Sequence, residues 1–312
     1  MKSNKYHLFQ NNGPQSNGRI IWMLMAIAIL FCCCTGKGDK QPVIAKTDSL
    51  PKKVDSVKKT TPLINPSGKT VEERFRLPDG YERVKVADNS FGAFLRKLPL
   101  KANGSVVHLY DGTVKSDTVY DAVIDYDIGN QDLEQCADAV IRLRAEYLYS
   151  VKEYYKIAFH FTNGFLADYQ HWMDGYRITV KGNNVSWVKT NQPMNNYKSF
   201  REYLNVVFSY AGTLSLSKEL ISKSMKDIAP GDVIIRGGSP GHAVTVLDVA
   251  INRNGQKIFM IAQSYMPAQD IHILKNRNTP EISPWYVDNN SDLFTPEYAF
   301  TNNELKCFKE EK

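Results

Sequence analysis

The part of the chain that most constrains the fold is the stretch 227–266, DIAPGDVIIRGGSPGHAVTVLDVAINRNGQKIFMIAQSYM. It contains β-branched runs at 232–236, 242–250 and 258–265, separated by a glycine-rich loop and by an Asn-Arg-Asn-Gly turn. Short runs of this kind, bounded by turn residues, are typical of strands. The stretch therefore predicts three successive strands that form a β-meander.

Two polar residues of this meander, His242 and Gln263, form a candidate site. Side chains alternate between the faces of a strand, so an even turn places His242, Val244, Gln263 and Tyr265 on one face. The amide oxygen of Gln263 can then accept the Nδ1 hydrogen of His242 and leave Nε2 free as a base for a nucleophile. The alternative for His242 is a strand-end histidine satisfied by its surroundings.

The composition is that of a globular protein with a mildly basic charge. Of the 312 residues, 43% are apolar and 11% aromatic, which suits one large or two small domains. The formal charge of +6 includes Lys2, Lys5 and Arg19 near the N-terminus, and without them about +3 remains. This charge, with no Walker loop and no dinucleotide fingerprint, predicts neither a nucleic-acid partner nor a bound cofactor.

Residues 1–33 have the pattern of a lipoprotein signal peptide. Basic residues precede the apolar run IIWMLMAIAILF and three consecutive cysteines. The run is shorter than the ~20 residues of a membrane span and fits an export signal. The residues before Cys33 resemble a loose bacterial lipobox, which implies a lipid anchor on Cys33, or alternatively on Cys34. An uncleaved signal anchor is the other alternative.

The rest of the chain divides into a tether, one domain and a short tail. Residues 34–74 lack aromatic side chains and are rich in Lys, Asp, Ser, Thr and Pro, so they cannot bury enough apolar surface to offset their conformational entropy. We predict a disordered tether over 34–74, a domain over 75–308 and a tail over 309–312. Helical patterns come early in the domain and contiguous strands come late, which favours the α+β class.

Several elements are predicted within the domain. A short helix is expected after Ser90, which is a suitable N-cap, and strands are expected at 106–110 and 122–128. A long amphipathic helix is predicted over 132–155, with Asp132 and Gln135 as a pair that resembles a capping box. A second helix is predicted over 199–220, weakened in its middle by Gly212.

Cys136 is the candidate nucleophile, because it lies in the first turn of the predicted long helix. The positive end of the helix dipole and an adjacent protonated histidine both favour the thiolate, which is the nucleophilic form. Two alternatives remain open. Cys136 can be a small core residue, or it can form a disulfide with Cys307 in an oxidising compartment.

The order of these residues resembles that of the NlpC and CHAP cysteine peptidases and amidases. The matching residues are Cys136, Pro230-Gly231-Asp232, Gly241-His242 and Gln263. The resemblance implies a papain-like fold in which the helix that carries Cys136 packs on an antiparallel sheet, here with an insertion. It also implies that Cys136 attacks, His242 is the base and Gln263 orients the ring. The chain departs from the usual pattern in two places, Gln135-Cys136-Ala137 and Gln263.

The domain as a whole, residues 75–308, resembles a family of bacterial lipoproteins known as domain of unknown function 4846. With the lipobox, this implies a lipid-anchored protein of the bacterial cell envelope, on the periplasmic or outer-membrane side. By analogy, the substrate is a peptidoglycan stem peptide or a related amide. The alternatives are an inactive envelope-binding lipoprotein and an acyltransferase on the same scaffold. His108 and His272 are expected to be structural, and His160 and His171 lack metal-ligand spacing.

The leader yields a prediction that does not depend on the domain. We expect the mature chain to begin at Cys33 and to carry a diacylglycerol anchor. The intact mass of the protein from the membrane fraction measures both the start and the modification. An unmodified N-terminus upstream of Cys32 would contradict the prediction.

Overall fold

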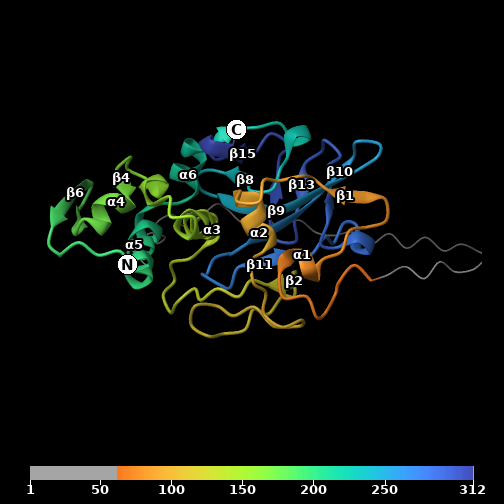
Figure 1. Cartoon of the computed structure of the whole chain (residues 1–312), viewed down its shortest axis with the longest axis horizontal. Coiled ribbons are helices and arrows are strands. Elements are labelled where there is room, and N and C mark those ends of the chain that lie inside the picture. The colour runs from red at the N-terminus through yellow and green to blue at the C-terminus, as the bar shows by residue number, and fades with distance from the viewer. Residues whose placement is uncertain (1–61, 312) are drawn as a thin grey trace, which may run out of the picture. The chain divides into compact units, whose positions relative to one another are not determined.

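The computed structural model describes residues 62–311, which form an α+β fold around a large antiparallel sheet (Figure 1). The main path of the sheet is β2-β11-β10-β9-β8-β15-β7, with β1 paired to β9 and β12 paired to β10. These strands are β1 Tyr81–Arg83, β2 Tyr120–Val123, β7 Ile221–Ser222, β8 Val233–Arg236, β9 His242–Asn252, β10 Lys257–Gln263, β11 His272–Leu274, β12 Tyr286–Val287 and β15 Leu305–Cys307.

Six α-helices and three separate hairpins complete the described part. The helices are α1 Val71–Arg74, α2 Phe91–Arg96, α3 Cys136–Ser150, α4 Tyr169–Met173, α5 Tyr197–Tyr210 and α6 Thr213–Glu219. The hairpins are β3 Ala158–His160 with β4 Leu166–Asp168, β5 Tyr176–Lys181 with β6 Asn184–Lys189, and β13 Leu293–Phe294 with β14 Ala299–Phe300. Short 3-10 turns occur at Tyr154–Lys156, Met225–Asp227, Pro280–Ile282 and Lys309–Glu311.

The predicted meander is confirmed as β8, β9 and β10 at the centre of the sheet. Arg236 pairs with His242 between β8 and β9, and Ala262 pairs with Thr245 between β9 and β10. The register of the second pair shifts between Met260 and Ile261. All nine residues of β9 from His242 to Ala250 are buried, as is expected of a central strand covered on both faces.

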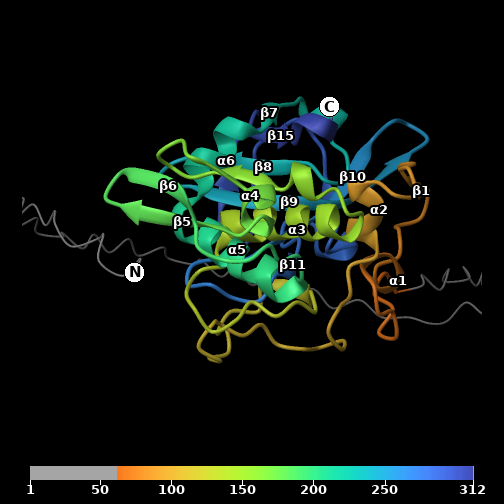
Figure 2. The ribbon, with the colours of Figure 1, turned by 60° about the vertical axis from the view of Figure 1, so that its left-hand side comes forward.

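The sheet separates two hydrophobic cores. α3 packs across β9 on one face (Figure 2), where Ala243 and Leu247 lie in the same core as the apolar side chains of the helix. Val244 and Val246 point the other way, into a second core that includes Phe300. From Ala243 to Leu247, period-2 alternation thus gives each face its own apolar side chains. The register shift beside Leu247 then exchanges the faces, so Val249 lies in the second core and Ala250 in the first.

The helix boundaries differ in part from those that the sequence predicts. α2 follows the predicted N-cap, since the hydroxyl of Ser90 accepts a hydrogen bond from the N–H of Ala93 at 3.2 Å. α3 begins only at Cys136, because the carboxylate of Asp138 accepts from the N–H of Gln135 at 3.1 Å and ends the preceding loop there. The helix predicted over 199–220 is two helices, α5 and α6, which are interrupted at residues 211–212.

The first part of the insertion expected between the two parts of the site lies between α3 and α5. It contains the β3–β4 hairpin, α4 and the β5–β6 hairpin, and the last of these extends away from the main sheet (Figure 2). None of its strands belongs to the main sheet.

Two further expectations need correction. Residues 62–74, which the sequence assigned to the tether, are part of the fold: Val71 is buried, and the guanidinium of Arg74 donates to the carbonyl of Gly68 at 2.6 and 2.9 Å. Backbone pairing and one buried arginine therefore compensate for the lack of aromatic residues. The strand predicted at 106–110 is wrong, since the segment forms only the isolated bridges His108–Val114 and Leu109–Gln269.

The signal peptide, the lipidation at Cys33 and most of the predicted tether lie outside the described residues. Within 62–311, no helix has both the length and the apolar character that a membrane crossing needs.

A buried ion-pair network anchors the N-terminal part of the domain to β9. Asp248 is fully buried and binds Arg83 at 2.6 Å and Arg96 at 2.7 Å. Removing one partner of a buried ion pair leaves the other charge without compensation, which costs about 3–5 kcal/mol. The network therefore holds β1 and α2 to the sheet.

We predict that Asp248→Asn lowers the free energy of unfolding by about 3–5 kcal/mol. Asp117→Asn is the matched control, because the pair of Asp117 with Arg277 is about half exposed on both sides, and such pairs contribute about 0–1 kcal/mol. Urea unfolding followed by circular dichroism measures both. Equal losses in the two variants would contradict the role of Asp248.

Candidate functional site

The structure brings His242 and Gln263 together, but not through the even turn that was expected. Five residues, 252–256, lie between the paired Ile251 and Lys257, and the register shift between Met260 and Ile261 returns Gln263 to the face of His242. His242 begins β9 and Gln263 ends β10, and the Nε2 atom of the ring lies 2.7 Å from the amide oxygen of Gln263. The sequence analysis assigned this contact to Nδ1, and that detail is wrong. Nδ1 is therefore the ring nitrogen that Gln263 leaves free.

Cys136 occupies the first position of α3, next to the start of β9. The N–H groups of the first helical turn have no partner within the helix, so the backbone around Cys136 offers free donors. The backbone groups of Ala137, of Cys136 itself and of Ala243 act on the thiol and favour a lower pKa. Because Ala243 follows His242 directly, the thiol lies beside the backbone of the strand that carries the imidazole.

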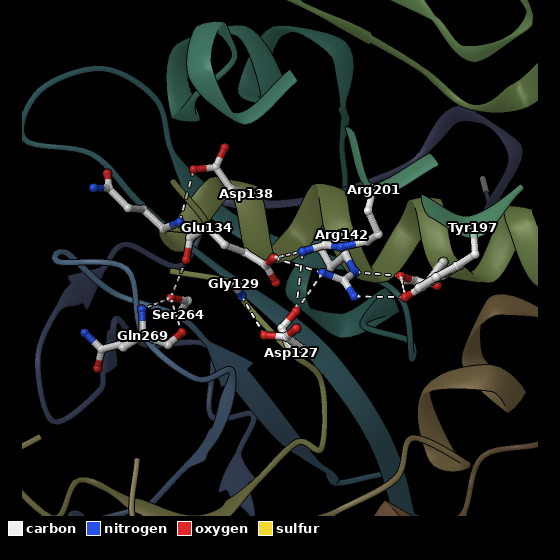
Figure 3. A network of polar contacts seen from close by, with 11 residues as sticks. Asp127, Gly129, Glu134, Asp138, Arg142, Tyr197, Arg201, Ser264 and Gln269 are labelled. Atoms are coloured by element: carbon white, nitrogen blue, oxygen red, sulfur yellow. Dashed lines mark hydrogen bonds and ion pairs between the residues drawn. The ribbon is translucent and has the colours of Figure 1, made fainter. Parts of the chain in front are cut away.

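A polar network fixes the loop before Cys136 (Figure 3). The hydroxyl of Ser264, the residue after Gln263, donates to the carbonyl of Glu134 at 2.8 Å. The carboxylate of Glu134 binds Arg142 at 3.0 Å and Arg201 at 3.3 Å. The residue that follows β10 is thus hydrogen-bonded to the backbone of Glu134, two residues before Cys136. This hydrogen bond sets the distance between the helix start and the His242–Gln263 pair.

Burial determines the charge state of the site. Burial and, to a smaller extent, the charge of Asp138 together raise the pKa of the Cys136 thiol from 9.0 to about 11. Burial lowers the pKa of His242 from 6.5 to about 4, which the hydrogen bond with Gln263 opposes. Both groups are therefore neutral at pH 7, so the thiolate expected from the helix dipole and a protonated histidine is not the resting form.

Aromatic rings enclose His242. Its ring centroid lies 4.9 Å from that of Tyr265, 5.0 Å from that of Tyr298 and 5.8 Å from that of Phe300. The hydroxyl of Tyr298 donates to the carbonyl of Pro240 at 3.2 Å, in the glycine-rich loop before His242. Only 2% of His242 is exposed, which explains the lowered pKa of the ring.

The amide nitrogen of Gln263 contacts residues that were not predicted from the sequence. The amide nitrogen of Gln263 donates to the carboxylate of Glu297 at 2.6 Å, and Lys115 pairs with that carboxylate at 2.5 Å. His272, expected to be merely structural, pairs with Gln263 across β10 and β11, and its Nε2 lies 3.4 Å from the amide nitrogen. Glu297 and Lys115 lie in irregular segments without periodicity, so the sequence offers no signal for them.

Other candidates do not join the site. Cys136 and Cys307 are not joined in a disulfide, so the disulfide alternative is wrong. Within residues 62–311, no group of three or more His, Cys, Asp or Glu side chains could hold a metal ion. Cavities of about 380 and 350 Å³ lie elsewhere, the first beside Ser222, Lys223 and Asn303 and the second beside Val84, Gly92 and Asp227.

The raised pKa of the thiol predicts slow alkylation of Cys136. A pKa higher by about 2 than the ordinary value of 9.0 lowers the thiolate fraction at pH 7 about 100-fold. We therefore expect iodoacetamide to label Cys136 about 100-fold more slowly in the native chain than in the urea-unfolded chain. The native rate should rise about tenfold per pH unit between pH 7 and 9. Peptide mass spectrometry measures the label, and rapid native labelling at pH 7 would contradict the burial argument.

Comparison with known proteins places the chain in a family. Residues 71–307, from the start of α1 to the end of β15, match the family described as Domain of unknown function (4846). No curated protein and no solved structure matches the chain. The match spans more than half of the chain and includes Cys136, His242 and Gln263, so this protein belongs to the family described as Domain of unknown function (4846).

Proposed function

We propose that this protein is a cysteine hydrolase of the bacterial cell envelope that cleaves an amide bond. The observation that carries the proposal is the 2.7 Å contact between Nε2 of His242 and the amide oxygen of Gln263. It leaves Nδ1 as a base on the ring, and the residue after His242, Ala243, acts through its backbone on the thiol of Cys136. A nucleophile, a base and a third group that orients the base are the parts that such a hydrolase needs.

Each residue has a defined role in the proposed reaction. The sulfur of Cys136 attacks the amide carbonyl while its proton passes to Nδ1 of His242, and the unpaired N–H of the helix start stabilises the oxyanion. His242 then gives the proton to the departing amine as the C–N bond breaks. Water hydrolyses the resulting thioester to a carboxylic acid and restores the thiol. Gln263 holds the ring throughout.

The fold and the leader support the rest of the proposal. A helix that carries Cys136 and packs on an antiparallel sheet is consistent with a papain-like scaffold of the NlpC and CHAP type. A lipid anchor at Cys33 would keep the domain at the periplasmic or outer-membrane side of the envelope. In that compartment we propose a peptidoglycan stem peptide, or a related amide, as the substrate.

The charge state of the site favours one competing function, an envelope-binding lipoprotein without turnover. A thiol with a pKa of about 11 and an imidazole with a pKa of about 4 do not form a thiolate–imidazolium pair at rest. The hydrolase therefore requires that proton transfer and attack occur together when the substrate has displaced water. A binding protein has no such requirement.

Mutation of the three residues separates the two functions. We expect Cys136→Ala to abolish cleavage of peptidoglycan fragments and His242→Ala to lower the rate about 10²–10⁴-fold, the usual contribution of a positioned base. Gln263→Ala should lower the cleavage rate less than His242→Ala, because a neutral amide orients the ring without stabilising the charge of the imidazolium. Mass spectrometry of the released peptides measures the rates.

The double variant Cys136→Ala/Gln263→Ala should be no slower than Cys136→Ala alone, since such residues act as a unit. Unchanged turnover in Cys136→Ala would refute the assignment of the nucleophile. If the wild type cleaves no fragment but binds one, and His242→Ala weakens that binding, the binding function replaces the hydrolase.

A further inference from the structure

We propose that Glu297 is a positioning residue that, through the amide of Gln263, keeps the proton of the His242 ring on Nε2 and leaves Nδ1 free as the base. The effect on catalysis rests on the proposed hydrolase function. The effect on the position of the proton follows from the contacts of four side chains and is independent of turnover.

The first step is the orientation of the Gln263 amide. An ionised carboxylate can only accept hydrogen bonds, and Oε2 of Glu297 lies 2.6 Å from the nitrogen of the Gln263 amide. Lys115 donates to the other oxygen of Glu297 at 2.5 Å, so the carboxylate belongs to an ion pair. The opposite amide orientation would bring two acceptor oxygens together. The nitrogen of Gln263 must therefore face Glu297.

His272 favours the same orientation, through a contact that is longer and weaker than the one with Glu297. Its Nδ1 lies 2.8 Å from the carbonyl oxygen of Asp270, and a carbonyl only accepts, so Nδ1 carries the hydrogen. Burial lowers the pKa of His272 to about 4, so the ring is neutral at pH 7 and its Nε2 is an acceptor. That Nε2 lies 3.4 Å from the nitrogen of Gln263. Both hydrogens of the amide thus point to acceptors.

The orientation of the amide then selects the tautomer of His242. With its nitrogen turned to Glu297 and His272, Gln263 presents its oxygen to Nε2 of His242 at 2.7 Å. An amide oxygen only accepts, so Nε2 is the protonated nitrogen of the neutral ring and Nδ1 holds the lone pair. Within residues 62–311, no hydrogen bond occupies Nδ1.

The position of Glu297 suits an indirect role. It lies between β13 and β14, its side chain is 15% exposed, and the amide of Gln263 separates it from the imidazole. A carboxylate in this place holds the amide without touching the reacting atoms. If Glu297 is lost, the amide can turn and donate to Nε2, which moves the proton to Nδ1 and removes the base.

Nitrogen NMR of the full chain labelled with ¹⁵N-histidine tests this directly, without a substrate. Pyrrole-type and pyridine-type nitrogens give well-separated signals, and the His242 signals are assigned by their loss in His242→Gln. In the wild type at pH 7 we expect a pyridine-type Nδ1 and a pyrrole-type Nε2. In Glu297→Leu we expect Nδ1 to shift towards the pyrrole type. A pyrrole-type Nδ1 in the wild type would overturn the proposal without any variant.

Two variants separate orientation from general loosening of the structure. In Lys115→Met/Glu297→Gln the introduced amide oxygen has no lysine to satisfy, so it can accept from Gln263 and should restore the wild-type tautomer. Glu304→Leu is the matched control, because Glu304 binds Arg236 at 2.6 and 2.9 Å and makes no contact with Gln263. It should leave the His242 signals unchanged.

An unchanged His242 spectrum in folded Glu297→Leu overturns the proposal. If that variant does not fold by circular dichroism, the isosteric Glu297→Gln replaces it. Its single oxygen is shared between Lys115 and Gln263, so a partial shift is expected and an unchanged spectrum again overturns the proposal.

Turnover adds a second readout where cleavage is established. In such a chain, Glu297→Leu should lower kcat about tenfold or more and leave KM little changed. The upper limit of the loss is the ~10²–10⁴-fold that a positioned base contributes in full. A shifted tautomer in a chain that cleaves nothing would instead reject the hydrolase and leave the positioning role intact.

Discussion

The buried guanidinium of Arg142 is the constraint on which the geometry of the site depends. It lies between Glu134 at 3.0 Å and Glu146 at 2.7 Å, with 2% of its side chain exposed. A charge so far from water is tolerated only when it is paired, and removing a partner costs about 3–5 kcal/mol. Glu134 cannot move away from α3 without breaking this pair. Because Glu134 also accepts from Ser264, the pair determines where the helix that carries Cys136 starts relative to Gln263.

The same burial that stabilises the scaffold sets the chemistry of the site. A dry environment penalises both the thiolate of Cys136 and the imidazolium of His242, so their pKa values move apart to about 11 and about 4. The resting pair is neutral. The thiol is thereby kept out of the thiolate form, which is the form that is oxidised.

Sequence reasoning predicted the parts of the fold that depend on local patterns. The strands of the meander and the Ser90 cap follow from runs of β-branched residues and from single-residue capping, so they needed no tertiary information. The face that Gln263 occupies depends on the register shift in β10, which the pattern did not predict. Sequence reasoning failed where one particular side-chain contact determines the structure. α3 starts at Cys136 because Asp138 caps Gln135, and residues 62–74 fold because Arg74 finds the carbonyl of Gly68. Glu297 reaches Gln263 from a loop, and His272 reaches it through the pairing of β10 with β11, and no local pattern encodes either contact.

Gln263 offers a physical reason for an amide, rather than a carboxylate, beside the imidazole. A carboxylate in direct contact would favour the imidazolium and raise the pKa of His242, and it would place an additional charge in a region that is almost fully buried. With glutamine at this position, the nearest negative charge is that of Glu297, one side chain further from the imidazole, where the ammonium group of Lys115 compensates it. The ring then keeps a fixed orientation and remains neutral. An acceptor for the imidazole and a donor for the carboxylate are both required at this position, and among the side chains of similar length only glutamine supplies the two.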